Sequence, residues 1–216
     1  MEKPKNILAR FRMRLDSLLL VIWIGGIWTV GYIVAPVLFS TLDDRSTAAL
    51  VAGKLFSIVG ITGLYCGSLL LFLLITDGQR MRRFRPLFML WLVFEIAGRF
   101  STLPVLYGGA VYLVVLAAFL RWQLDTGYFR YWQFWVLVLM LLSTAIGHFY
   151  LTPEIESLRQ VGEAARAKAG FGMLHGTASI LFLLTSLGGL ALVLAGLPLR
   201  DKRPKRATHH PGNSSN

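Results

Sequence analysis

Long apolar runs separated by short charged stretches dominate this chain. The apolar runs cover residues 15–39, 54–76, 87–122, 132–151 and 171–197. A helix needs roughly 20 consecutive apolar residues to cross the hydrocarbon core of a bilayer, and every run reaches that length. The pattern therefore predicts an all-α, polytopic integral membrane protein whose core is formed by neighbouring helices and lipid.

The run at residues 87–122 is too long for one span, and it contains Glu95, Arg99 and Pro104. In one arrangement it forms a hairpin of two spans, which gives six transmembrane helices in all. Glu95 and Arg99 are four residues apart and can pair on one helix face, which lowers the cost of charge at membrane depth. In the alternative arrangement, four helices cross the membrane and the stretch from residue 87 lies on the inner surface as an interfacial helix. The six-helix arrangement is the preferred prediction.

The basic residues give this arrangement an orientation. The chain carries a net charge of +11, and most of its lysines and arginines lie in clusters beside apolar runs, at residues 3–14, 80–85 and 200–206. Such clusters are typical of cytoplasmic flanks, whereas a nucleic-acid-binding protein spreads them over a soluble surface. The pattern predicts a multi-pass membrane protein with both termini cytoplasmic, and it argues against nucleic acid as a partner.

The same pattern divides the chain into three parts. Residues 1–14 form a basic cytoplasmic N-terminus, residues 15–197 form the helix bundle, and residues 198–216 form a basic tail that we expect to be disordered. The expected partner is the lipid bilayer. The sequence leaves open whether a second copy or another membrane protein also binds.

Helix-start signals follow the apolar run that ends at residue 151. Thr152 is a candidate N-cap, Pro153 fits the first helical position, and Glu154 stands beside it. Apolar residues then recur at helical spacing among polar neighbours such as Arg159. These features predict an amphipathic surface helix from Pro153 to about Gly170, lying along the outer face.

Two histidines, His148 and His175, flank this predicted surface helix. They stand at similar depth on consecutive antiparallel spans, so a shared site is geometrically possible, and imidazole binds haem iron, copper and zinc. The preferred interpretation is that no cofactor is bound. Both side chains are then expected to form hydrogen bonds while facing the bundle or the underside of the surface helix. A haem- or copper-binding protein is the alternative.

Recognised catalytic motifs are absent from the sequence. It has no P-loop, no HExxH, no CxxC and no GxSxG, and the single Cys66 lies within an apolar run, where we interpret it as packing. The sequence therefore predicts a protein that is not an enzyme. Apart from the histidines, the structural or functional candidates are Glu95, Arg99, Pro153, Glu154 and Arg159.

Small and bulky residues in the first two spans predict close helix packing. Gly63 and Gly67 share one helix face with other small residues, so another helix can approach closely there. Trp23 and Trp28 lie too deep for interface anchors. We interpret them as bulk that packs against such glycine faces.

Four segments, in this order, resemble a known family: WIGGIWTVGYIVAPVLF, TLDDRSTAALVAGKLF, GHFYLTPEIESLR and FGMLHGTASILFLL. They are similar to conserved segments in the bacterial relatives of transmembrane protein 205, catalogued as domain of unknown function 4149. The resemblance implies a four-helix integral membrane core, located in the bacterial inner membrane, with no settled activity, enzyme class or cofactor. Residues 87–122 are longer than the usual pattern of that family, which indicates an inserted hairpin.

Three functions are compatible with these features. The preferred one is a non-enzymatic membrane protein that scaffolds, assists assembly or handles a small solute or metal. The second is the haem- or copper-binding protein that uses His148 and His175. The third is a membrane enzyme that acts on a lipid or quinone, for which the sequence offers no set of catalytic residues.

Overall fold

A computed structural model describes residues 4–75, 105–123, 132–159 and 170–197. Every regular element in these ranges is a helix, which confirms the all-α prediction. In chain order the elements are α1 (Pro4–Trp28), η1 (Thr29–Val34), α2 (Ala35–Thr41), α3 (Arg45–Ile75), α5 (Val105–Gln123), α6 (Trp132–Ile146), η4 (Gly147–Leu151), α7 (Thr152–Arg159) and α9 (Phe171–Ala195). The elements η1 and η4 are π-helical segments.

Four continuous stretches within the described ranges are long and apolar enough to cross a membrane: residues 15–41, 45–74, 132–158 and 171–195. This supports a membrane protein. The six-helix count stays a prediction, because residues 76–104, which include Glu95 and Arg99, lie outside the described residues.

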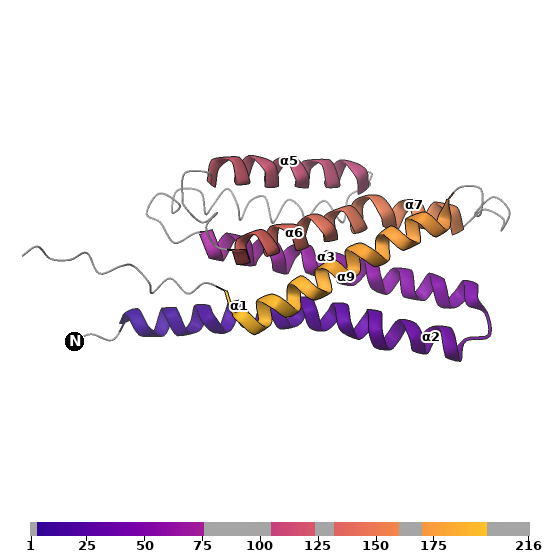
Figure 1. Cartoon of the computed structure of the whole chain (residues 1–216), viewed down its shortest axis with the longest axis horizontal. Coiled ribbons are helices and arrows are strands. Elements are labelled where there is room, and N and C mark those ends of the chain that lie inside the picture. Colours follow the sequence, from indigo (N-terminus) through magenta and orange to yellow (C-terminus); the bar gives the residue numbers. More distant parts are fainter. Residues whose placement is uncertain (1–3, 76–104, 124–131, 160–169, 198–216) are drawn as a thin grey trace, which may run out of the picture.

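The helices run up and down along one long axis (Figure 1). The chain begins and α9 finishes at one end, which we call the terminal end. The connection from α2 to α3, together with α7 and the start of α9, lies at the opposite end, which we call the hairpin end. The helix α5 runs antiparallel to α6 and therefore in the same direction as α3 (Figure 1). Ile75 and Val105 consequently lie at opposite ends of the bundle.

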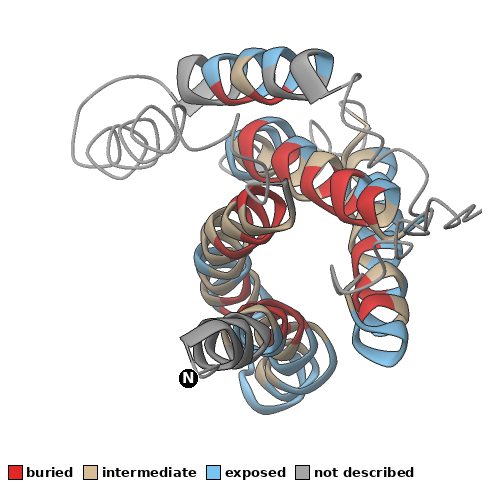
Figure 2. Cartoon of the chain, turned by 90° about the vertical axis from the view of Figure 1, so that its left-hand side faces the viewer, coloured by how far each residue is buried: buried red, intermediate tan, exposed pale blue. Residues whose placement is uncertain are grey.

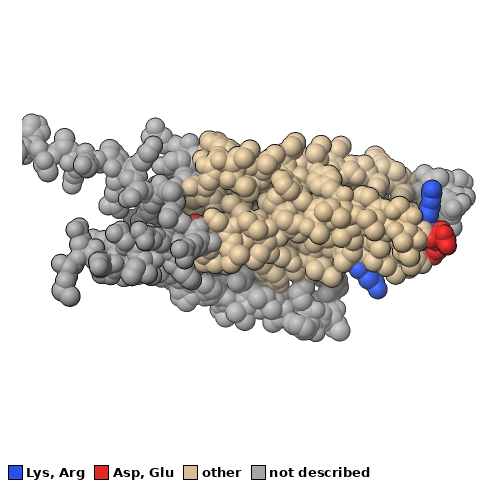
Figure 3. Space-filling view, turned by 90° about the horizontal axis from the view of Figure 1, so that it is seen from below, with Lys and Arg blue, Asp and Glu red and all other residues tan. Residues whose placement is uncertain are grey.

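The core lies where α1, α3, α6 and α9 meet, since α1 and α6 each pack against both α3 and α9. Buried residues lie on the sides that neighbouring helices turn toward each other, and the outward sides are exposed (Figure 2). On the face seen in Figure 3, charged side chains lie near the ends and leave a broad uncharged band between them. Both features fit a bundle surrounded by lipid.

Glycines in α3 set the distance between α1 and α3, as the sequence predicts. A Cβ atom added at Gly63 would collide with the indole ring of Trp23, and one added at Gly67 would lie 2.6 Å from both Trp23 Cζ3 and Leu141 Cδ2. The prediction that Trp23 packs on a glycine face is thereby confirmed. Trp28 behaves differently, because it is partly exposed and its indole N–H donates to the Ser186 hydroxyl of α9 at 2.7 Å.

Thr41 and Asp44 both precede α3, and both carry side chains that can cap a helix. Leu42 is extended, and Asp44 accepts hydrogen bonds from the backbone N–H groups of Ser46 and Thr47 at 2.9 and 3.0 Å. Asp44 is thus the N-cap. Hydrogen bonds to its carboxylate, chiefly from the Thr47 hydroxyl and then from the two backbone groups, hold the pKa of Asp44 below its ordinary value.

Candidate functional site

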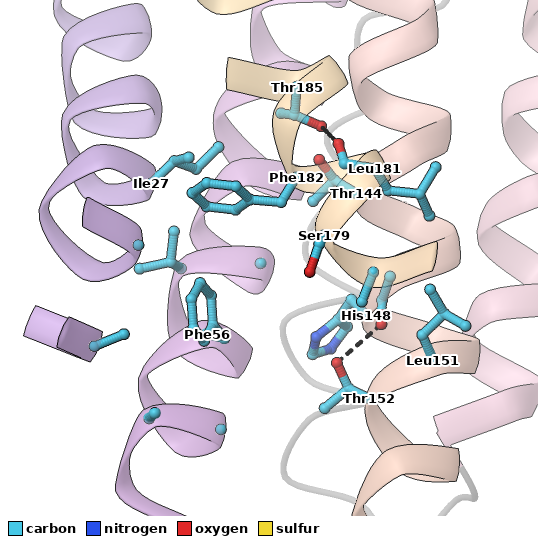
Figure 4. Close-up of a pocket in the computed structure, with 18 of the residues that line it drawn as sticks. Ile27, Phe56, Thr144, His148, Leu151, Thr152, Ser179, Leu181, Phe182 and Thr185 are labelled. Carbon is cyan, nitrogen blue, oxygen red and sulfur yellow. Dashed lines mark hydrogen bonds between the residues drawn. The ribbon is translucent and has the colours of Figure 1, made fainter. Parts of the chain in front are cut away.

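A cavity of about 510 Å³ lies between the helices in the hairpin-end half of the bundle. Its walls come from α1, η1 and α2 on one side, α3 behind, and α6, η4, α7 and α9 on the other (Figure 4). Small-molecule sites in proteins measure roughly 300–1,000 Å³, so the cavity has the size of such a site.

Trp23 forms the inner floor of the cavity. Its side chain is 1% exposed, and the nitrogen-bearing edge of its indole lies against Gly63 of α3. Beyond it, toward the terminal end, the bundle is filled by large, fully buried side chains, including Leu70, Leu137 and Leu141. The cavity therefore ends about halfway along the bundle and does not pass through it.

The cavity opens because α9 crosses the bundle obliquely. Near its middle α9 packs closely against α1 and η1. Because Gly189 has no side chain, Ile24 can approach it, and because Gly31 has none, the Phe182 ring can approach it. Toward its N-terminus α9 stays close to α7 and diverges from α2 (Figure 1). The exposed residues Phe39 of α2 and Ser179 of α9 stand on opposite sides of this opening.

Phe182 marks the point where the opening begins. Its ring packs edge-to-face against Tyr32 at a centroid distance of 5.5 Å and against Phe56 of α3 at 5.8 Å. The Tyr32 hydroxyl in turn lies 3.3 Å from the Ser186 hydroxyl. These contacts tie α9 to η1 and α3 at mid-bundle, so the two halves of α9 have different surroundings.

Both π-helical segments of the described chain border this cavity, and each ends two residues before a proline. Residues 29–34 precede Pro36, and residues 147–151 precede Pro153. A proline inside a helix removes one N–H donor and crowds the carbonyl four residues earlier, and a π-helical turn re-spaces the carbonyls there. Because π-bulges occur frequently at functional sites, their position on two walls of one cavity supports a functional role for it.

Four hydroxyl groups on the walls share one feature. Each donates its proton to a carbonyl of its own helix, at 2.8 or 2.9 Å: Thr144 to Met140, Thr152 to Gly147, Ser179 to His175 and Thr185 to Leu181. Ser143 supplies a fifth hydroxyl on the described wall. The bonds of Thr152 and Thr185 are drawn in Figure 4. Most of the remaining wall is apolar.

The family model described as "Domain of unknown function (DUF4149)" matches residues 18–108 and 99–164. The chain belongs to the DUF4149 family. This confirms the family named from the sequence, whereas the link to transmembrane protein 205 stays a prediction. The comparisons with curated proteins and with solved structures find no match. The DUF4149 match includes the cavity walls from α1 through α7, and α9 lies beyond it.

The structure places both predicted histidines on the cavity wall. His148 of η4 is 6% exposed, and its Nδ1 would lie 3.3 Å from a Cβ added at Gly60 of α3. His175 lies in the first turns of α9, where it is exposed and parallel to the Phe171 ring at 6.1 Å. Within the described residues, no group of three or more His, Cys, Asp or Glu side chains could hold a metal ion.

The remaining candidates fall in different places. Pro153 and Glu154 lie in the first turn of α7, Glu154 is exposed, and Arg159 is the last residue of α7. The predicted helix start at Thr152 is wrong, because Thr152 has helical dihedral angles, φ −61° and ψ −51°, and its hydroxyl bonds backward to Gly147. The span therefore continues to residue 158, and the widened turn at residues 147–151 accommodates Pro153 inside it.

Sequence reasoning did not identify Phe182 or Glu156 as site residues. Glu156 is exposed and stands on the α7 part of the cavity wall. A signal for the cavity walls is nevertheless present in the sequence: a glycine precedes a proline by five or six residues at Gly31–Pro36 and Gly147–Pro153, and these are the two places where the described helices widen. Gly98–Pro104 has the same spacing and lies outside the described residues.

Proposed function

We propose that this DUF4149 protein is a non-enzymatic protein of the bacterial inner membrane that binds a small solute in the cavity of its hairpin-end half. The observation that carries the proposal is the shape of the cavity: it is large enough for a small molecule and is closed at mid-bundle by the buried Trp23. A site open toward one end favours capture or presentation of a solute over continuous passage through the bundle.

The proposed orientation has both termini in the cytoplasm and the cavity facing the outside. The described chain begins and ends at the terminal end (Figure 1), and the basic residues 3–14 and 200–206 flank those same helices. Such clusters favour the cytoplasmic side. Six spans are part of the proposal, supported by the placement of Ile75 and Val105 at opposite ends of the bundle.

Thiol labelling tests one-sided access. In a Cys66→Ala background, which removes the only cysteine, single cysteines replace Ser179 at the opening, Thr144 on the inner wall, or the outward-facing Leu194, which is 78% exposed. A water-soluble, membrane-impermeant thiol reagent is then added to spheroplasts or to inverted vesicles. We expect fast labelling of Ser179→Cys and slower labelling of Thr144→Cys in spheroplasts only, and none of Leu194→Cys.

Two results would contradict the proposal. Equal labelling of Thr144→Cys from both sides would indicate a continuous pathway. Unreactive cysteines at both wall positions would indicate a filled interior without a solute site.

A haem or copper site is the second candidate, because His148 and His175 line the same cavity. An absorbance spectrum and metal analysis of the purified protein distinguish it from the first. A Soret band or stoichiometric copper that is lost in both His148→Ala and His175→Ala would favour this candidate.

A further inference from the structure

Four of the five hydroxyl groups on the described cavity wall offer acceptors rather than donors. A hydroxyl group has one proton to donate and two lone pairs that accept. The protons of Thr144, Thr152, Ser179 and Thr185 are already given to backbone carbonyls, so toward the cavity these oxygens present only lone pairs. An occupant that carries N–H groups can use them, whereas a carboxylate or phosphate cannot.

Trp23 does not add a hydrogen-bond donor to the cavity wall. Its indole N–H is a donor, but the nitrogen is fully enclosed and lies against Gly63 behind the cavity floor. A molecule in the cavity therefore contacts carbon atoms of the Trp23 ring and not its N–H group.

The charged side chains on the wall also favour a cation over an anion. Within the described ranges no lysine or arginine lines the cavity, whereas the Glu156 carboxylate does. Aromatic rings also line it, among them Phe39, Phe56 and Phe182, and an aromatic face attracts an ammonium group. Among these described side chains an anion finds no lysine or arginine, whereas a cation finds a carboxylate and aromatic surfaces. The Ser143 hydroxyl and the imidazole rings of His148 and His175 also line the cavity, and each can donate or accept a hydrogen bond.

We propose that the occupant is a lipophilic ammonium compound: its apolar body fills the space between α2, α3 and α9, while its N–H groups bond to the hydroxyl oxygen of Thr152, which stands one helical turn before the Glu156 carboxylate. This rests on the proposed solute-binding function and specifies the class of solute. The side opening between α2 and α9 gives such an amphiphile a route from the bilayer, where it partitions.

Three probes with one rigid cage test the class: 1-adamantylammonium, neutral 1-adamantanol and 1-adamantanecarboxylate. Binding is measured by isothermal titration calorimetry to the full chain in nanodiscs of zwitterionic phosphatidylcholine, with empty nanodiscs subtracted. We expect saturable binding of the ammonium at one site, about tenfold weaker binding of the alcohol, and no binding of the carboxylate. Tenfold corresponds to about 1.4 kcal/mol, which is near the upper end of the net contribution of a typical hydrogen bond.

Matched variants locate the site. Ala178→Trp, on the cavity wall, should abolish binding by filling the cavity. Thr152→Val should weaken ammonium binding about two- to tenfold, whereas Thr177→Val, which removes a similar hydroxyl bonded to Met173 away from the cavity, should leave it unchanged. The pair of Thr152 and Thr177 variants keeps the test valid if the Ala178 variant fails to fold.

A second pair tests the charge. Glu156→Gln should weaken ammonium binding about two- to fivefold at low salt, with a smaller effect at high salt. Glu154→Gln, at an exposed position outside the cavity wall, should have no such effect.

The outcomes separate this inference from the function on which it rests. Carboxylate binding equal to or tighter than ammonium binding, or alcohol binding as tight as ammonium binding, would overturn the ammonium class and leave solute binding intact. Ammonium binding that survives Ala178→Trp in folded protein would overturn the assignment to this cavity. If none of the probes binds and the wall cysteines are also unreactive, the proposed function itself fails.

Discussion

The contact between Trp23 and the glycines of α3 makes a quantitative prediction about Gly67→Ala. The added methyl would lie 2.6 Å from Trp23 Cζ3 and from Leu141 Cδ2, and both side chains are fully buried. Overpacking of this kind costs about 1–3 kcal/mol, whereas replacing glycine by alanine within a helix recovers about 0.5–1 kcal/mol. The expected net loss is roughly 1–2 kcal/mol of unfolding free energy.

Gly25 supplies the matched control. It lies in α1, and an added Cβ meets nothing within 4 Å. Gly25→Ala therefore causes no clash and gains only the higher helix stability of alanine. We expect its stability to equal that of the parent or to exceed it by up to about 1 kcal/mol. Reversible unfolding in mixed micelles, at increasing fractions of a denaturing detergent, measures both variants against the parent.

A double variant identifies the clashing group. Trp23→Phe removes the ring atoms nearest to position 67, so Gly67→Ala should cost less in that background than in the parent. Equal stability changes for Gly67→Ala and Gly25→Ala would refute this account of the α1–α3 packing. So would strictly additive effects of Gly67→Ala and Trp23→Phe.

Three further predictions follow from the site and the topology. His148→Ala and His175→Ala should each weaken probe binding while membrane insertion, followed by fractionation, stays intact; a double variant that binds normally would refute a role for either. Reporter fusions after Thr41 should read as external and those after Arg206 as cytoplasmic, and the reverse would overturn the orientation. Asp44→Ala should loosen the start of α3, seen as faster proteolysis of the α2–α3 connection. Because the folded-state pKa of Asp44 is lowered, the contribution of its cap is present at neutral pH and is lost as the pH falls below the ordinary value of 3.8.

The helical class and much of the packing could be predicted from the sequence. Apolar length alone indicated membrane helices, and the spacing of Gly63 and Gly67 indicated a close helix contact. Both signals are local, because each depends on residues within one helix. They can therefore be recognised without knowing which helix packs against them.

The predicted break at Thr152 shows where local signals are insufficient. Thr152 and Pro153 match an N-terminal cap, but the preceding turn widens into a π-helix and accommodates the proline within a continuous span. The start of α3 is a second case, since the side chains of both Thr41 and Asp44 can cap a helix. The extended backbone at Leu42 excludes a helix that begins there, so Asp44 is the cap. The pattern of residue types in one sequence predicts neither the widened turn before Pro153 nor the residue that caps α3.

The cavity itself could not be predicted, because it depends on the path of α9. Gly189 brings α9 against α1 at one point, and Phe182 begins the opening beyond it. The sequence shows that both histidines lie at similar depth. Whether they face a cavity, a packed core or lipid depends on the crossing of α9, which no spacing within one helix specifies.

Photolabelling tests the central claim, that this cavity is a binding site, most directly. A diazirine derivative of 1-adamantylammonium is bound to the full chain in phosphatidylcholine nanodiscs and activated by light, and the modified residues are mapped by peptide mass spectrometry. The predicted labels lie on the cavity wall, at Phe56 of α3 and at Ser179 or Phe182 of α9, and excess unlabelled 1-adamantylammonium suppresses them. Labels confined to outward-facing residues such as Leu187 and Leu194, which are 55% and 78% exposed, and unaffected by the competitor would contradict the claim.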